Sequence, residues 1–307
     1  MELITEPGTI NDLVADAAAA GHKITPRLIR DWTEHGLLDY PQRRSAGKGH
    51  GSAPALYPAS QRNLLLTLLH HRPGIHISSL ARIPVSIWMY WGEEYVTLRQ
   101  ARRALMTWLG DARASRHKAR DAAHSILGKI GGPQATSRDR RELIDVLTEA
   151  GWTGRPDFPR MERAIRAVFE PGYGHVRKDA GHPSAPMMTD SMIEVMKARL
   201  IAATALRDGH VADEELTDAR DAHLFAYAEY AATRPFLAAA LPPGSAQLYE
   251  PVTAEETLSN CCSHLLSTIG LQLMHPENAE RLRGARAFQR RPTPAMIGLV
   301  TPPQTDG

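Results

Sequence analysis

Two arginines, Arg27 and Arg30, lie three residues apart in the segment ITPRLIRDWTEHGLL, and they offer the most specific chemistry in the chain. A guanidinium group binds phosphate oxygens, or the edge of a guanine, through paired hydrogen bonds. Thr25 and Pro26 are typical of the first positions of a helix, and Gly36 is typical of its end. The segment therefore predicts a short helix that carries both arginines on its polar side.

The apolar residues of this segment, Leu28, Ile29 and Trp32, recur at helical spacing and are expected to face a core. A capped helix that is apolar on one side and basic on the other fits a major groove of DNA. We therefore expect Arg27 and Arg30 to contact DNA. The alternative is that they are ordinary surface arginines on an amphipathic helix.

Further basic and polar residues flank this helix. Lys23 and Thr25 stand at its entrance, where hydroxyls and amides commonly meet phosphate. The glycine- and proline-rich stretch 41–58 predicts a loop or thin hairpin, a candidate wing, after the helix. Its candidate DNA contacts are Arg43, Arg44 and Lys48. The alternative for these three is a solvated loop that contacts nothing.

A second helix is expected directly before this one. Thr9 and Asp12 form a capping-box pattern that opens a helix from Ile10 to Ala20, and Gly21 ends it. Two short helices joined by a tight turn give the order of a helix-turn-helix.

These residues resemble the N-terminal domain of the MerR superfamily of bacterial transcription regulators. That family shows a segment of the type Ser-Pro-Arg-Thr-Leu-Arg-Tyr-Tyr-Glu-x-x-Gly-Leu-Leu, then a wing arginine and a Tyr. The matching positions are Pro26, Arg27, Ile29, Arg30, Trp32, Gly36, Leu37 and Leu38, followed by Arg43 or Arg44 and by Tyr57. The resemblance covers roughly residues 8–110 and departs at two positions. Asp31 replaces an aromatic residue, and Ala55 stands where the family often has a second arginine.

The resemblance implies a winged helix-turn-helix, a homodimer formed through a long helix, and transcription control that acts on a promoter bound by RNA polymerase. We expect a mostly α fold with a small β wing. The expected domains are a DNA-binding domain over 1–92, a linking or dimerisation helix over 93–130, an all-α effector or oligomerisation domain over 131–290, and a disordered tail over 291–307. Within the third domain we expect helices at about 137–150, 159–170, 189–207, 211–233, 253–274 and 276–289.

The distribution of charge agrees with a nucleic-acid module followed by a regulatory one. Residues 1–141 hold 20 Lys/Arg against 12 Asp/Glu, a net charge of +8. Residues 142–307 hold 16 against 22, a net charge of −6. The alternative is uneven surface charge without functional meaning.

Other classes of site lack support in the sequence. There is no nucleophile elbow, phosphate loop or dinucleotide fingerprint, so no enzyme and no cofactor is predicted. The two cysteines are adjacent, and their spacing to His264 does not match a zinc motif, so no metal is predicted. His223, Tyr227 and Tyr230 share a helix face, where they either line a pocket or pack; we expect packing.

The vicinal cysteines indicate a reducing cytoplasm, and no apolar run reaches the roughly 20 residues of a membrane span. We therefore expect a cytoplasmic, bacterial, sequence-specific regulator that binds double-stranded DNA as a homodimer, with a small-molecule effector or RNA polymerase as further partners. The alternatives are an architectural or recombination factor, and a protein-interaction module with a degenerate winged helix.

Overall fold

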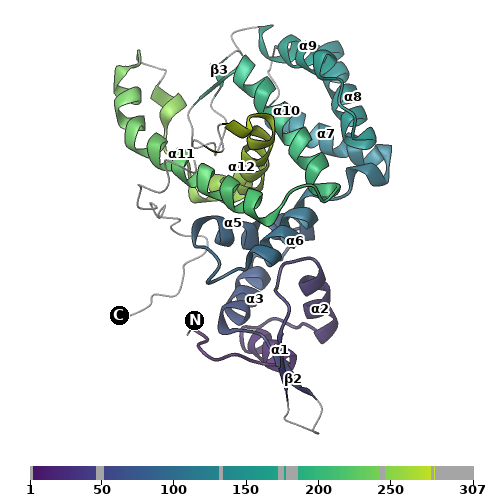
Figure 1. Cartoon of the computed structure of the whole chain (residues 1–307), viewed down its shortest axis with the longest axis vertical. Helices are drawn as coiled ribbons and strands as arrows, with labels where there is room; N and C mark the ends of the chain where they lie inside the picture. The colour runs from purple at the N-terminus through teal and green to yellow at the C-terminus, as the bar shows by residue number, and fades with distance from the viewer. Residues whose placement is uncertain are drawn as a thin grey trace. The chain divides into compact units, whose positions relative to one another are not determined.

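The computed structural model describes residues 3–45, 52–130, 134–171, 176–177, 186–242, 246–277 and 280. The chain divides into two compact units, which we call unit 1 (residues 1–109 with 293–307) and unit 2 (residues 110–292). Both units are built mainly from helices, with only short strands, as the sequence predicts (Figure 1). The division lies between the two boundaries expected at 92 and 130.

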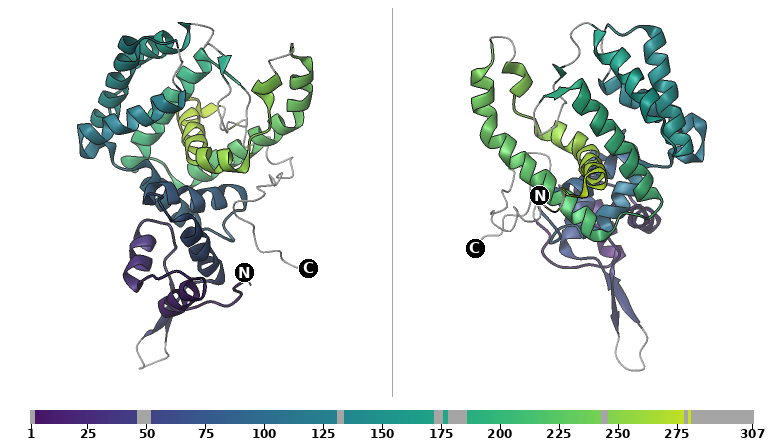
Figure 2. Two further views of the ribbon diagram at one scale, coloured as in Figure 1. Left: turned by 180° about the vertical axis from the view of Figure 1, so that it is seen from behind. Right: turned by 45° about the horizontal axis from the view of Figure 1, so that its top comes forward.

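Unit 1 begins with two short helices and a β-hairpin, and four more helices follow. These are α1 (Ile10–Ala19), α2 (Pro26–Glu34), β1 (Gln42–Ser45), β2 (Ser52–Leu56), α3 (Ala59–His71), α4 (Ile77–Leu80), α5 (Arg82–Tyr90) and α6 (Leu98–Leu109). The strands are antiparallel, with Gln42 opposite Leu56 and Arg44 opposite Ala53. Figure 2 shows this hairpin projecting from the helices of unit 1.

The core of unit 1 is formed where the apolar faces of these helices meet. Leu13 of α1 and Leu65 of α3 are fully buried, and every residue of α5 from Ile83 to Tyr90 is buried. Arg62 of α3 ties α1 to this core, because its Nε and Nη2 donate to the two oxygens of Asp16 at 2.7 and 2.8 Å. Helices too short to be stable alone are thereby held by packing.

The described residues of unit 2 form six longer helices and a second small sheet. Its elements are η1 (Ala112–Ala114), α7 (Arg116–Ile130), α8 (Ser137–Thr153), α9 (Phe158–Phe169), β3 (Val176–Arg177), β4 (Met187–Met188), α10 (Thr189–Arg207), α11 (Asp213–Ala240), η3 (Ala246–Tyr249) and α12 (Ala254–Met274). β3 pairs with β4 in the stretch between the helices expected at about 159–170 and 189–207, where no strand was predicted. The expected helix at 276–289 and the tail 291–307 lie almost wholly outside the described residues.

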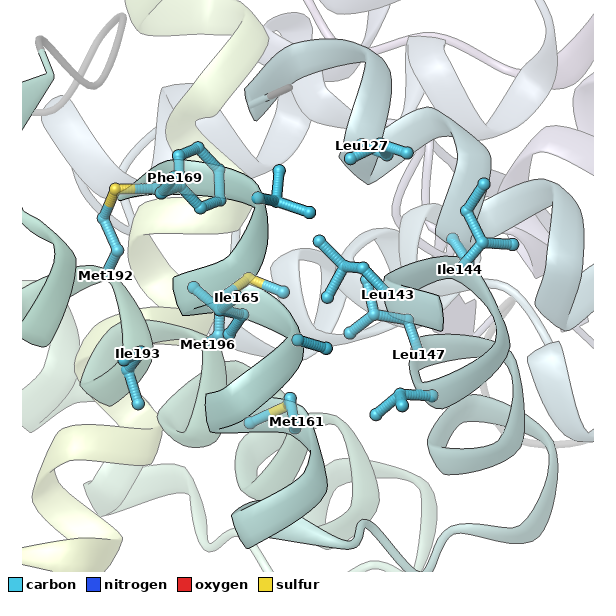
Figure 3. Close-up of a cluster of buried hydrophobic side chains, with 14 of the residues drawn as sticks. Leu127, Leu143, Ile144, Leu147, Met161, Ile165, Phe169, Met192, Ile193 and Met196 are labelled. Carbon is cyan, nitrogen blue, oxygen red and sulfur yellow. The ribbon is translucent and has the colours of Figure 1, made fainter. Parts of the chain in front are cut away.

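The main core of unit 2 is assembled from α7, α8, α9 and α10. Figure 3 shows leucine, isoleucine, methionine and phenylalanine side chains from these helices meeting in one cluster. Phe169 and Met161 of α9 and Leu143 of α8 are fully buried there. α12 packs on α10 so closely that a Cβ at Gly270 would collide with the backbone of Ala198.

The expectation of one linking helix over 93–130 is wrong. α6 ends at Leu109, Gly110 takes a left-handed φ of +60°, and a short 3-10 turn follows before α7 begins at Arg116. Ser115 caps α7, since its Oγ accepts from the amide of Lys118 at 3.2 Å. A glycine stop followed by a serine cap is a local signal for two helices, and it outweighs the apolar periodicity that runs through both.

Candidate nucleic-acid interface

The helix predicted to contact DNA is α2, and its ends form as its sequence indicates. The Thr25 hydroxyl accepts from the amide of Leu28 at 3.3 Å, and Pro26 occupies the first helical position. Gly36 follows the helix with a φ of +72°. A left-handed residue at this place is nearly free of strain only for glycine. The chain can therefore turn sharply after α2 and return to the core.

The buried side of α2 is anchored to unit 1 as predicted. Ile29 and Trp32 are 0 and 3% exposed. The Thr33 hydroxyl donates to the carbonyl of Ile29 at 2.9 Å and lies 3.4 Å from the hydroxyl of Tyr57. Burial raises the pKa of Tyr57, and the bond to Thr33 and the charge of Arg30 only partly oppose this rise. Tyr57 is therefore neutral at physiological pH and acts as a packing residue.

A buried carboxylate fixes the chain just after α2. Asp39 accepts from Thr97 at 2.7 Å and from the guanidinium groups of Arg99 and Arg103 at 3.0 Å each. The Arg103 guanidinium also lies over the Tyr40 ring, 4.1 Å from its centre. α6 is thus fastened to the segment that leaves α2. Sequence reasoning missed this cluster, because its members are about 60 residues apart.

Opposite this anchored side, α2 presents four exposed charged side chains. Arg27 and Arg30 are exposed as predicted, and Asp31 and Glu34 lie beside them on the same face. The Tyr40 hydroxyl donates to the Glu34 carboxylate at 3.1 Å. The exposed face of α2 therefore carries two cations and two anions, where the sequence analysis had noted only Asp31 beside the arginines.

The remaining predicted contact residues lie around α2. Lys23 and Thr25 are exposed at the entrance of the helix, and Arg43 and Arg44 are exposed on β1. Lys48 lies outside the described residues. Arg30 shares a groove with the base of the hairpin, which places α2 and the hairpin on one side of unit 1.

This groove has a volume of about 480 Å³ and lies between the start of α1, the end of α2 and the base of the hairpin. Its charged lining residues are Arg30 and Glu34. The other lining residues are Thr9, Ile10, Asn11, Thr33, Tyr40, Pro41, Pro54, Ala55 and Tyr57. The tyrosine and proline rings give it apolar surface next to the polar side chains of Thr9 and Asn11.

Several arginines of unit 1 differ in whether their charge is paired. Arg62, Arg99 and Arg103 form ion pairs with carboxylates. In contrast, the side chains of the arginines at the predicted interface form no hydrogen bond and no ion pair with any residue that the structure describes. These are Arg27, Arg30, Arg43 and Arg44. Their guanidinium groups are therefore available to a ligand.

The two units differ less in net charge than residues 1–141 differ from residues 142–307. Residues 1–109 hold 12 Lys/Arg against 9 Asp/Glu, a net charge of +3. Residues 110–292 hold 24 against 24, a net charge of zero. Much of the excess counted over 1–141 comes from the start of unit 2. The case for an interface therefore rests on where the arginines lie and not on total charge.

Candidate residues of unit 2 are used in packing. His223 and His264 are buried and stack with ring centres 5.4 Å apart, and Tyr230 stacks on Tyr249 at 6.5 Å. This agrees with packing as the role expected for the aromatic face of α11. Cys261 and Cys262 are buried and form no disulfide. The described residues contain no cluster of three or more histidine, cysteine or acidic side chains that would hold a metal ion.

Across the described ranges, no helix has both the length and the apolar content that crossing a bilayer requires. Comparison with family models, with curated proteins and with solved structures gives no match to this chain.

Proposed function

We propose that the chain is a sequence-specific DNA-binding protein whose unit 1 works as a winged helix-turn-helix of the MerR type. α1 and α2 would form the helix-turn-helix, and β1–β2 would form the wing. The observation that carries the proposal is the set of four exposed, unpaired arginines, Arg27 and Arg30 on α2 and Arg43 and Arg44 on β1. The opposite side of α2 is anchored in the core, and β1 is an exposed strand that pairs with β2.

The mechanism follows from these positions. α2 enters the major groove with Arg27 and Arg30 toward the base edges, while Lys23 and Thr25 meet the phosphates beside its entrance. The hairpin carries Arg43 and Arg44 along the backbone or into the minor groove. Each arginine that neutralises a phosphate releases a counterion, so affinity falls as salt rises.

We further propose that the protein acts as a cytoplasmic transcription regulator and binds two related half-sites as a homodimer. The helices of unit 2 would then serve oligomerisation or the sensing of an effector. The resemblance implies a homodimer formed through one long helix, and the break between α6 and α7 removes that helix. The dimer contact is therefore assigned to no particular element.

A protein-interaction module is the second candidate, and the balanced charge on the exposed face of α2 favours it. Asp31 and Glu34 cancel the charge of Arg27 and Arg30, so this face lacks the net positive charge that favours a phosphate backbone. The two candidates differ in their response to salt. Phosphate contacts by the three cations Lys23, Arg43 and Arg44 of each copy predict a slope of about −2.7 in a plot of log affinity against log salt, and a protein interface has no such requirement.

The test measures binding of the full chain to fluorescently labelled genomic duplex fragments by anisotropy at several salt concentrations. Arg30→Ala is expected to weaken specific binding about 5- to 150-fold, which corresponds to about 1–3 kcal/mol. Arg155→Ala is the matched control, because Arg155 is an exposed arginine of unit 2. Equal losses in the two variants, or no salt dependence in the wild type, would contradict DNA binding through α2.

A further inference from the structure

The exposed face of α2 carries acidic residues that a surface built only for phosphate would lack. Arg27 and Arg30 share this face with Asp31 and Glu34, so the face has no net charge. A carboxylate repels the phosphate backbone and therefore weakens sequence-independent affinity. If α2 binds DNA, these carboxylates need a partner that donates hydrogen bonds.

The acids are also not explained by ion pairs within the helix. Arg27 and Asp31 are four residues apart, as are Arg30 and Glu34, and both spacings place the partners on one face. Among the described residues of unit 1, Arg27 forms no ion pair with Asp31, and Arg30 forms none with Glu34. Glu34 accepts from Tyr40, whereas the Asp31 side chain has no hydrogen bond to any described residue. Asp31 is therefore the free acceptor.

The major groove offers one base edge that suits such an acceptor. Cytosine presents the N4 amino group, a donor, whereas guanine presents two acceptors and thymine an acceptor with a methyl group. Adenine presents its N6 donor next to the N7 acceptor, which repels a carboxylate. Arginine prefers the two acceptors of guanine. An arginine and an aspartate on one helix face therefore match guanine and cytosine respectively.

We propose that α2 reads a half-site rich in G·C pairs, with an arginine of α2 on guanine and Asp31 as the residue that selects cytosine. The inference rests on the proposed function and names the sequence class that this surface recognises. Arg27 and Asp31 are separated by about one helical turn, roughly 5.4 Å. Base pairs are spaced about 3.4 Å apart, so the guanine and the cytosine lie within about two base steps of each other.

The experiment selects bound duplexes from a randomised double-stranded library with the full chain and sequences them. The wild type is expected to enrich a motif with G·C pairs at neighbouring positions. Asp31→Asn is expected to replace cytosine by adenine at one position, because an asparagine amide pairs with N6 and N7 of adenine. Glu93→Gln is the matched control, since Glu93 is an exposed acid of unit 1 away from α2, and its motif should equal that of the wild type.

A second measurement needs no variant. In the selected duplex, the cytosine assigned to Asp31 is replaced by a pyrimidinone analogue that lacks the N4 amino group. The wild type should then lose at least about fivefold in affinity. No enrichment of any sequence would overturn the proposed function itself. An enriched motif of A·T pairs, an Asp31→Asn motif identical to that of the wild type, or full affinity for the analogue would leave DNA binding intact and overturn this inference.

Discussion

Replacing Gly36 by alanine tests how firmly α2 is seated. Gly36 has a φ of +72°, and an alanine there costs about 1–2 kcal/mol because its Cβ crowds the backbone in the left-handed region. The new Cβ would also meet the backbone nitrogen of Ala104 and would lie 2.6 Å from the Cβ of Arg103. α6 would have to move, and such overpacking costs about 1–3 kcal/mol more.

Together the two contributions predict that Gly36→Ala lowers the free energy of unfolding by about 2–5 kcal/mol. This is a large part of the roughly 5–15 kcal/mol that stabilises a folded domain. Gly21→Ala separates them, because Gly21 follows α1 with a φ of +83° and a Cβ there would meet nothing within 4 Å. This control should lose only the backbone contribution, about 1–2 kcal/mol.

The assay is urea unfolding of the full chain followed by tryptophan fluorescence. Four of the five tryptophans lie in unit 1, so the signal reports mainly on that unit; they are Trp32, Trp88, Trp91 and Trp108, with Trp152 in unit 2. Gly36→Ala should unfold at distinctly lower urea than Gly21→Ala. Equal midpoints for the two variants would refute the claim that α6 packs directly on the turn after α2.

Three further substitutions test the packing and the ion pairs. Arg62→Lys removes one of two hydrogen bonds to Asp16 and should cost unit 1 about 1–3 kcal/mol in the same urea assay; an unchanged midpoint would contradict the pairing. The Arg113 guanidinium lowers the pKa of Asp208. The ionised carboxylate therefore stabilises unit 2 when the pH is above the ordinary pKa of an aspartate, and this stabilisation is lost as the pH falls through the lowered pKa. The melting temperatures of wild type and Asp208→Asn should therefore converge below about pH 4, and a constant difference would count against the pair. Phe169→Ala should cost about 3–5 kcal/mol by circular dichroism, because Phe169 is fully buried in the core of unit 2; a loss under 1 kcal/mol would argue against that core.

The ends of several helices could be predicted because local residues determine them. The hydroxyl of Thr25 and the ring of Pro26 fix the start of α2, and the reciprocal bonds of Thr9 and Asp12 fix the start of α1. These signals act within four residues, so they are legible in the sequence. The same type of signal is present at Gly110 and Ser115, where it ends α6 and starts α7, and a prediction that follows the apolar periodicity on both sides misses it.

The candidate site could be predicted only in part. Exposure of Arg27 and Arg30 followed from the helical period, since the apolar residues of α2 define the opposite face. The cluster around Asp39 could not be predicted, because Arg99 and Arg103 reach it from a distant helix. The acceptor role proposed for Asp31 depends on which neighbours leave its carboxylate unpaired, and only a three-dimensional structure describes them.

The central claim is that α2 gives this chain specific affinity for double-stranded DNA. The most direct measurement compares binding of the wild type and of the double variant Arg27→Ala/Arg30→Ala to a selected duplex and to a scrambled duplex at one physiological salt concentration. The account predicts that the wild type prefers the selected duplex by about 10³-fold or more and that the double variant loses this preference while remaining folded. Equal binding of both duplexes by the wild type, or an undiminished preference in the double variant, would contradict it.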